Sequence, residues 1–294
     1  MIYRQEVLAT LPILTEAFQK AQPFPHIVID NLFDDVTLHH VADAFYPTED
    51  PRWHRFADPQ RETKLASTSE MHLPSVVQQF IRELNAEQFL VQMSALTGIP
   101  GLIPDPYLLG AGMHLIMRGG KLAIHADFNK HPIMNVDRRL NLLIYLNQDW
   151  HESYGGHLEL WDRTMQTCVQ RILPIFNRMV VFLTDDFSFH GHPEPLTCPE
   201  HRVRKSIAMY YYTNGRPADE LRASGGHDTL FQERPQDRQE QSNFQPATAA
   251  SPILTELPVS SPPPQPPTRS WLTTLKRWFA NPWPSFRRKP ESRS

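Results

Sequence analysis

The chain has 294 residues and a formal net charge of -3, which excludes a strongly basic nucleic-acid-binding protein. Its hydrophobic content of 40% is enough for one sizeable domain, with or without a tail. Cys168 and Cys198 are too few for a disulfide scaffold, and we see neither a signal-peptide pattern nor an apolar run of membrane-spanning length. We therefore expect a cytoplasmic globular protein.

The first part of the chain predicts helices around one strand. Apolar side chains recur at helical spacing over residues 5–21, and an apolar β-branched run favours a strand over 23–31. An aspartate at 34 or 35 can cap a helix that reaches Phe45. Residues 47–64 have no clear period, so we expect a loop near the entrance to an active site.

Helical spacing returns over residues 74–97, where Asn85 divides the pattern and Gly98 suits a C-cap. From Leu108 onward the pattern changes to short apolar strands separated by glycine-rich turns. Strands that follow a helical N-terminal part predict a mainly β fold with flanking helices, as in a double-stranded β-helix or jelly roll.

One of these strands carries a histidine and a carboxylate two residues apart. His125 and Asp127 lie within the apolar run 122–128, so both side chains should point to the same face, about 6 to 7 Å apart along the strand. Two histidines and one carboxylate form the facial triad that holds non-haem Fe(II). A surface hydrogen-bonded pair would have the same spacing, so the hypothesis needs a third ligand from another strand.

The candidates for the third ligand are His190 and His192, which follow the apolar strand 179–184. Both would lie on one side of an extended segment. We favour His190, because His192 precedes Pro193 and begins a turn. The following strand, 205–212, is entered through Arg204 and Ser206, which share a strand face.

These residues and their order resemble the Fe(II)- and 2-oxoglutarate-dependent dioxygenases, and among them the prolyl-4-hydroxylase-like group. That family combines H-x-D, a distal histidine and a basic residue on the next strand, often as R-x-S. The segments 145–150 (YLNQDW) and 155–158 (GGHL) are similar to the oxygen-sensing prolyl hydroxylases of animals. The resemblance covers roughly residues 105 to 213 and extends more loosely to 23–30.

The resemblance implies a role for each residue. Fe(II) would be bound by His125, Asp127 and His190, and the far carboxylate of 2-oxoglutarate by Arg204. A guanidinium fork matches a carboxylate in bidentate fashion. Ser206 would add a donor, and Tyr145 would contact the co-substrate.

The reaction implied is hydroxylation of a C–H bond with O2 and release of succinate and CO2. Related halogenases have a small residue where this chain has Asp127, so the aspartate indicates hydroxylation. The substrate hypotheses are a prolyl or other polypeptide side chain, and a free amino acid or small metabolite. A non-catalytic jelly-roll binding module is the alternative from another class, and no nucleic-acid partner is expected.

Composition divides the chain into three parts. We expect a dioxygenase domain over 1–216, a disordered proline-rich linker over 217–268 and a basic aromatic tail over 269–294. In the tail, aromatic residues at helical spacing stand beside lysine and arginine, which suits a weak contact with an anionic membrane or a partner. A disordered, adhesive tail is the equal alternative.

Overall fold

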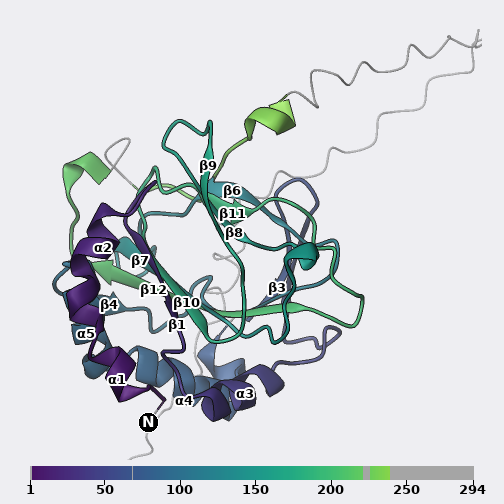
Figure 1. The fold of residues 1–294 in the computed structure, drawn as a ribbon, viewed down its shortest axis with the longest axis horizontal. Helices are drawn as coiled ribbons and strands as arrows, with labels where there is room; N and C mark the ends of the chain where they lie inside the picture. The colour runs from purple at the N-terminus through teal and green to yellow at the C-terminus, as the bar shows by residue number, and fades with distance from the viewer. Residues whose placement is uncertain (1, 68, 221–225, 239–294) are drawn as a thin grey trace, which may run out of the picture. The chain divides into compact units, whose positions relative to one another are not determined.

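The computed structural model describes residues 2–67, 69–220 and 226–238 (Figure 1). In these ranges the main feature is a 13-stranded sheet with the strand order β1-β10-β7-β12-β5-β3-β6-β11-β8-β9, with β2 beside β3, β4 beside β12 and β13 beside β6. All pairs are antiparallel. The strands are β1 (His26–Asp30), β2 (His54–Asp58), β3 (Glu62–Ala66), β4 (Ile103–Pro104), β5 (Gly112–Ile116), β6 (Leu122–Ala126), β7 (Asp137–Tyr145), β8 (Leu158–Trp161), β9 (Cys168–Ile172), β10 (Arg178–Leu183), β11 (His190–His192), β12 (Arg204–Thr213) and β13 (Leu230–Phe231).

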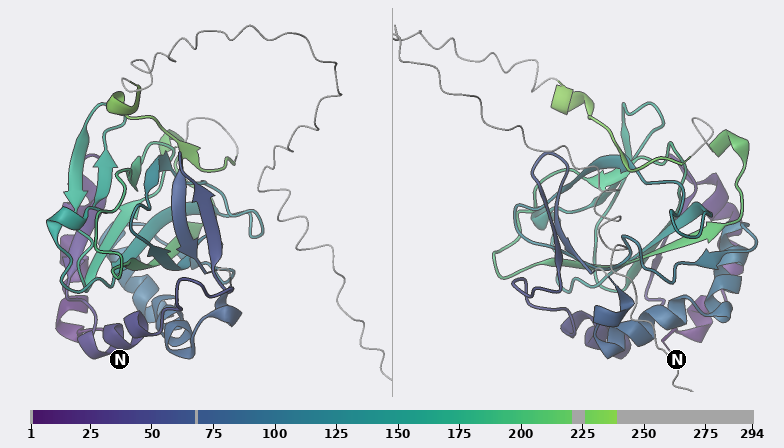
Figure 2. Two further views of the ribbon diagram at one scale, coloured as in Figure 1. Left: turned by 90° about the vertical axis from the view of Figure 1, so that its right-hand side faces the viewer. Right: turned by 180° about the vertical axis from the view of Figure 1, so that it is seen from behind.

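The sheet curls on itself, so that β7 and β10 face β8 and β9 (Figures 1 and 2). Tyr145 and Phe182 pack there against Leu158 and Leu160. We call this side of the strands the inner face. The mainly β, jelly-roll fold predicted from the sequence is confirmed.

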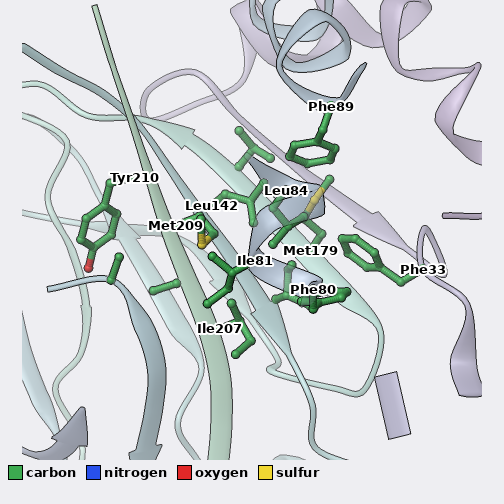
Figure 3. Packing of buried hydrophobic residues seen from close by; sticks show 14 of the residues in the cluster. Phe33, Phe80, Ile81, Leu84, Phe89, Leu142, Met179, Ile207, Met209 and Tyr210 are labelled. Carbon is green, nitrogen blue, oxygen red and sulfur yellow. The ribbon is translucent and has the colours of Figure 1, made fainter. Parts of the chain in front are cut away.

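The outer face of β7, β10 and β12 is covered by helices (Figure 1). Buried apolar residues of α4 meet Leu142, Met179 and Ile207 (Figure 3). Burying such a side chain contributes about 1.5–3 kcal/mol. Because strand side chains alternate, fixing Ile207 and Met209 against the helices turns Arg204 and Ser206 to the inner face. The helical segments are α1 (Gln5–Leu8), η1 (Leu11–Leu14), α2 (Thr15–Lys20), α3 (Asp35–Asp43), η2 (Glu70–His72), α4 (Ser75–Leu84), α5 (Glu87–Thr97), η3 (Glu152–Tyr154) and η4 (Ala218–Glu220).

Most expectations for the helices are confirmed. Asp34 caps α3 by accepting a hydrogen bond of 2.8 Å from the Thr37 amide. Asn85 separates α4 from α5, and Gly98 ends α5 in the left-handed conformation. The single helix expected over 5–21 is wrong, since it is divided into α1, η1 and α2, and Pro12 has no amide proton to continue a helix. None of the helices in the described ranges is long and apolar enough to cross a membrane.

The loop expected over 47–64 contains a hairpin instead. Strands β2 and β3 pair from His54↔Ala66 to Asp58↔Glu62. β2 is largely exposed on both faces, so it lacks the apolar alternation that predicts a strand. β3 in turn lies between β5 and β6 and joins them.

Part of the expected disordered linker is also ordered. Within residues 226–238, Leu230 and Phe231 pair with Ala126 and His125 of β6, and residues 235–238 form a helical turn. His227 Nε2 lies 2.8 Å from Asp186 Oδ1, and Arg234 pairs with Glu194. These contacts are made by backbone and polar groups, which composition does not reveal. The rest of the linker from residue 239 and the tail 269–294 lie outside the described residues.

Candidate active site

The histidine and carboxylate side chains predicted to bind metal converge on the inner face. His190 of β11 pairs with His125 of β6 in register, and Asp127 follows β6 directly. Asp127 Oδ1 lies 3.5 Å from His125 Nε2, and Asp127 Oδ2 lies 3.4 Å from His190 Nε2. Within the described residues, one potential ligand atom from each residue lies within 4.8 Å of the others. All three side chains are buried.

The backbone sets the orientation of both imidazoles. His125 Nδ1 lies 2.8 Å from the Ala123 carbonyl, and His190 Nδ1 lies 2.9 Å from the Ser188 carbonyl. Since a carbonyl can only accept, each Nδ1 carries the proton and each Nε2 keeps its lone pair for a ligand. Burial, with the neighbouring His125, lowers the pKa of His190 to about 4, so this ring is neutral near pH 7, as metal binding requires.

Asp127 is held by groups that sequence reasoning missed. Asn141 Nδ2 donates a 2.6 Å hydrogen bond to Asp127 Oδ2, and Arg138 Nη2 lies 3.1 Å from the same oxygen. Burial alone would raise the pKa of this carboxyl group, but Arg138 and the nearby histidines hold it well below its usual range. The carboxylate is therefore ionised and fixed before any metal arrives.

A bulge explains why the residues around Asp127 escaped prediction. In the pairing of β7 with β12, Tyr211 opposes Leu140 and Tyr212 opposes Arg138, so Arg139 is an extra residue. The extra residue shifts the alternation by one. Arg138 and Asn141, three positions apart, therefore reach the same carboxylate. A strict two-residue period would place them on opposite faces.

Arg204 lies at the start of β12, with its side chain buried. Its Nε donates to the Gly156 carbonyl at 2.9 Å, and its Nη2 lies 3.4 Å from the Tyr145 hydroxyl. Burial lowers the pKa of the guanidinium, and no carboxylate among the described residues forms an ion pair with it. A buried cation without an anion fits the predicted role as a carboxylate anchor.

Gly156 is a further contributor that the sequence reasoning treated only as a turn residue. Its φ is +73°, and a Cβ there would lie 2.6 Å from Leu196 Cδ2 and 3.0 Å from Arg204 Cδ. Only glycine lets this backbone carbonyl approach the guanidinium so closely. In the sequence, only the Gly155-Gly156 pair could have indicated this close backbone approach.

The remaining predicted residues lie beside Arg204. Tyr145 is fully buried at the end of β7, and the Arg204 guanidinium carbon is 4.9 Å from its ring centroid. Ser206 pairs with Tyr145 on one side and His114 on the other. The structure therefore brings Tyr145, Arg204 and Ser206 together on the inner face.

His192, the rival for the third ligand position, lies outside the group formed by His125, Asp127 and His190. Its side chain is buried, and neither ring nitrogen has a hydrogen-bond partner within the described residues. Burial and the charges of Arg204 and Lys64 hold its pKa well below the usual range.

The residues present fit both groups that the sequence resemblance implies. Two imidazole lone pairs and an ionised carboxylate are the donor set of a facial Fe(II) site. The buried, anion-free Arg204 fits one carboxylate of 2-oxoglutarate. Fold and site together define a jelly-roll protein able to hold a metal ion and a dicarboxylate.

Comparison with known proteins agrees with this class. Residues 111–212 match the 2OG-Fe(II) oxygenase superfamily. Fe(II) and 2-oxoglutarate are accordingly its cofactors. The prolyl 3-hydroxylase OGFOD1 of Mus musculus is 32% identical over 79 residues, which are 26% of this chain and 14% of that protein.

Solved structures share the fold. A prolyl hydroxylase from Trichoplax adhaerens, in complex with a hypoxia-inducible-factor peptide fragment, has a TM-score of 0.51 at 16% identity, covering 71% of this chain and 91% of that chain. A Pseudomonas putida prolyl-4-hydroxylase has a TM-score of 0.49 at 14% identity, covering 70% of this chain and 100% of that chain. The recognition of a prolyl-4-hydroxylase-like fold from the sequence is confirmed.

Proposed function

We propose that this protein is an Fe(II)- and 2-oxoglutarate-dependent hydroxylase that acts on a prolyl or other polypeptide side chain. The observation that carries the proposal is the pairing of two sites on one inner face. His125, Asp127 and His190 offer a metal-binding set, and Arg204 offers a buried cation that has no anion among the described residues. A binding module without turnover would not require both.

Each residue has a definite task in this proposal. His125, Asp127 and His190 hold the metal, and Arg138 and Asn141 keep Asp127 ionised and oriented. Arg204, oriented by the Gly156 carbonyl, binds the far carboxylate of 2-oxoglutarate, while Tyr145 and Ser206 flank it. Iron held there would supply the redox chemistry by which O2, 2-oxoglutarate and a C–H bond yield an alcohol, succinate and CO2. Burial of the site excludes water from it.

The polypeptide substrate is the finer part of the proposal. It is supported by the relatives, one of which is named a prolyl 3-hydroxylase and another of which was solved with a peptide fragment. The matched segment spans 14% of the first of these relatives, so its substrate is carried over only as a proposal.

The test measures co-substrate turnover first. Purified protein with Fe(II), 2-oxoglutarate and O2 should produce succinate slowly without substrate, and faster with proline-containing peptides that gain the mass of one oxygen atom. The control is Asp43→Ala, an exposed residue at the end of α3. Absence of succinate from folded, iron-loaded protein would refute the dioxygenase proposal. Oxidation of small amines or amino acids, with no peptide oxidised, would refute only the substrate class.

A further inference from the structure

His192 is a buried polar group that the proposed mechanism does not use. It lies at the end of β11, two residues beyond His190, and its exposed fraction is 3%. Neither Nδ1 nor Nε2 has a hydrogen-bond partner in the described part of the chain. Every other buried histidine of the described residues has at least one partner, as His26 has the Phe24 carbonyl at 2.8 Å.

An imidazole with two unpaired buried nitrogens is costly for a folded protein. Most buried polar side-chain atoms have at least one partner, and an unpaired one carries the cost of losing its water. A valine or leucine at this position would avoid that cost. The imidazole is therefore best explained by a partner that arrives with a ligand.

The position of His192 indicates where that ligand lies. Gly191 brings β11 close to β6, because a Cβ there would lie 2.8 Å from the Leu122 and Ala123 carbonyls. His190 and His192 then share the inner face, although β6 has an extra residue opposite them. His192 opposes Leu122 on β6, the strand that also carries His125, and the charge of Arg204 is close enough to help lower the pKa of His192. His192 thus lies near both the metal site and the carboxylate anchor.

We propose that His192 is a second anchor for 2-oxoglutarate, donating a ring N–H to a carboxylate oxygen of the bound co-substrate. This inference rests on the proposed function. A neutral imidazole has one N–H to donate, and a carboxylate only accepts. No acceptor for His192 lies among the described residues, whereas 2-oxoglutarate that extends from the metal towards Arg204 would bring carboxylate oxygens to this space.

His192 does not act as a metal ligand in this arrangement. The ligand atoms of His125, Asp127 and His190 already form a complete facial set, and His192 is outside it. Lys64, the other cation near His192, is already paired with Glu62 at 3.0 Å. His192 is therefore a binding residue of the co-substrate, separate from metal binding.

The experiment compares His192→Val, His192→Asn and His26→Val with the wild type. Protein loaded anaerobically with Mn(II) is titrated with 2-oxoglutarate by calorimetry, and the melting temperature is followed with and without both ligands. We expect His192→Val to weaken 2-oxoglutarate binding about tenfold, as loss of a hydrogen bond to a charged group predicts. The Mn(II) affinity should not change.

Two further readouts separate binding from packing. His192→Val should leave the melting temperature of the ligand-free protein unchanged or higher, because it removes unpaired nitrogens. His192→Asn, which keeps an N–H donor, should restore part of the affinity. His26→Val, which removes a buried histidine of β1 that is partnered by the Phe24 carbonyl, should lower the melting temperature without changing 2-oxoglutarate affinity.

The outcomes distinguish this inference from the proposed function. Equal 2-oxoglutarate affinity in wild type and His192→Val would overturn the second anchor and leave the hydroxylase proposal intact. Loss of Mn(II) binding in His192→Val would also overturn it, since His192 would then be a ligand. If wild-type protein binds Mn(II) but not 2-oxoglutarate, both proposals fail.

Discussion

The two ends of the site are built on different strands and differ in how completely the protein satisfies them. At the metal end, on β6 and β11, each imidazole Nδ1 has a carbonyl partner and Asp127 has two side-chain partners. At the other end, which we propose binds the co-substrate and call the co-substrate end, Arg204 has no anion and His192 has no hydrogen bond within the described residues.

The difference teaches which end depends on its ligand. The metal end is already oriented and needs only a cation, so the protein's own hydrogen bonds determine its geometry. The other end has a buried cation without an anion and an imidazole without a hydrogen-bond partner among the described residues, so the charge of the one and the N–H of the other are left for a ligand. Bound 2-oxoglutarate should consequently stabilise β12 and β11 more than metal alone does.

Removing the carboxylate breaks the metal end and has the largest expected effect. Asp127→Ala deletes one ligand and leaves Arg138 as an unpaired buried cation. We expect Fe(II) binding and succinate production to be lost, measured by anaerobic metal titration and product analysis. Asp43→Ala, exposed on α3, is the control. Turnover retained in Asp127→Ala would remove this residue from the metal site.

Removing the guanidinium breaks the co-substrate end alone. Arg204→Ala should weaken 2-oxoglutarate binding by about 100-fold, the scale expected when one partner of a buried charge pair is truncated. Metal affinity should stay the same, since Arg204 contacts Gly156 and Tyr145 and not the ligands. Arg202→Ala, two residues earlier, is the matched control. An equal loss in both variants would indicate a general charge effect instead.

A methyl group at Gly156 should sharpen the comparison, because it disturbs the anchor without changing its charge. Gly156→Ala places a Cβ 3.0 Å from Arg204 Cδ, and we expect about a tenfold loss of 2-oxoglutarate affinity. Gly155→Ala also places a Cβ at a positive φ, +71°, but that Cβ would lie 4.0 Å from its nearest neighbour. Both should lose stability by about 1–3 kcal/mol. Equal co-substrate affinity in the two variants would contradict the proposed role of Gly156.

The smallest expected effect comes from removing β13, which pairs with β6 beside His125. Truncation after Arg216 removes β13 from β6 and the contacts of His227 and Arg234. We expect the melting temperature to fall by roughly 3–6 °C, with Fe(II) affinity lowered a few-fold. Truncation after Gln245, at the boundary of the first compact unit, should change neither value. Identical melting temperatures for the two truncations would show that β13 contributes nothing to stability.

The parts of the site that lie on regular strands could be predicted from the sequence. The two-residue alternation of β6 and β12 predicted that His125 and Asp127 share a face, as do Arg204 and Ser206, because each strand is regular there. The contacts of Arg138 and Asn141 with Asp127 were not predicted, because the bulge at Arg139 breaks the two-residue alternation of β7. Strand β2 was missed because backbone pairing, not apolar burial, holds it. Strand β13 was missed because two apolar residues, Leu230 and Phe231, are too few to form a periodic pattern.

The position of β3 has a consequence for which piece of this chain can fold independently. The region that matches the superfamily, residues 111–212, includes β5 and β6 but not β3, the strand that hydrogen-bonds to both. An excised fragment of that region would have two separate ladders, one with Arg204 and one with the metal-binding residues. The segment that matches the superfamily is thus shorter than the part of the chain that must fold together. The β2–β3 hairpin, which precedes that segment, joins the ladder that carries Arg204 to the ladder that carries the metal-binding residues.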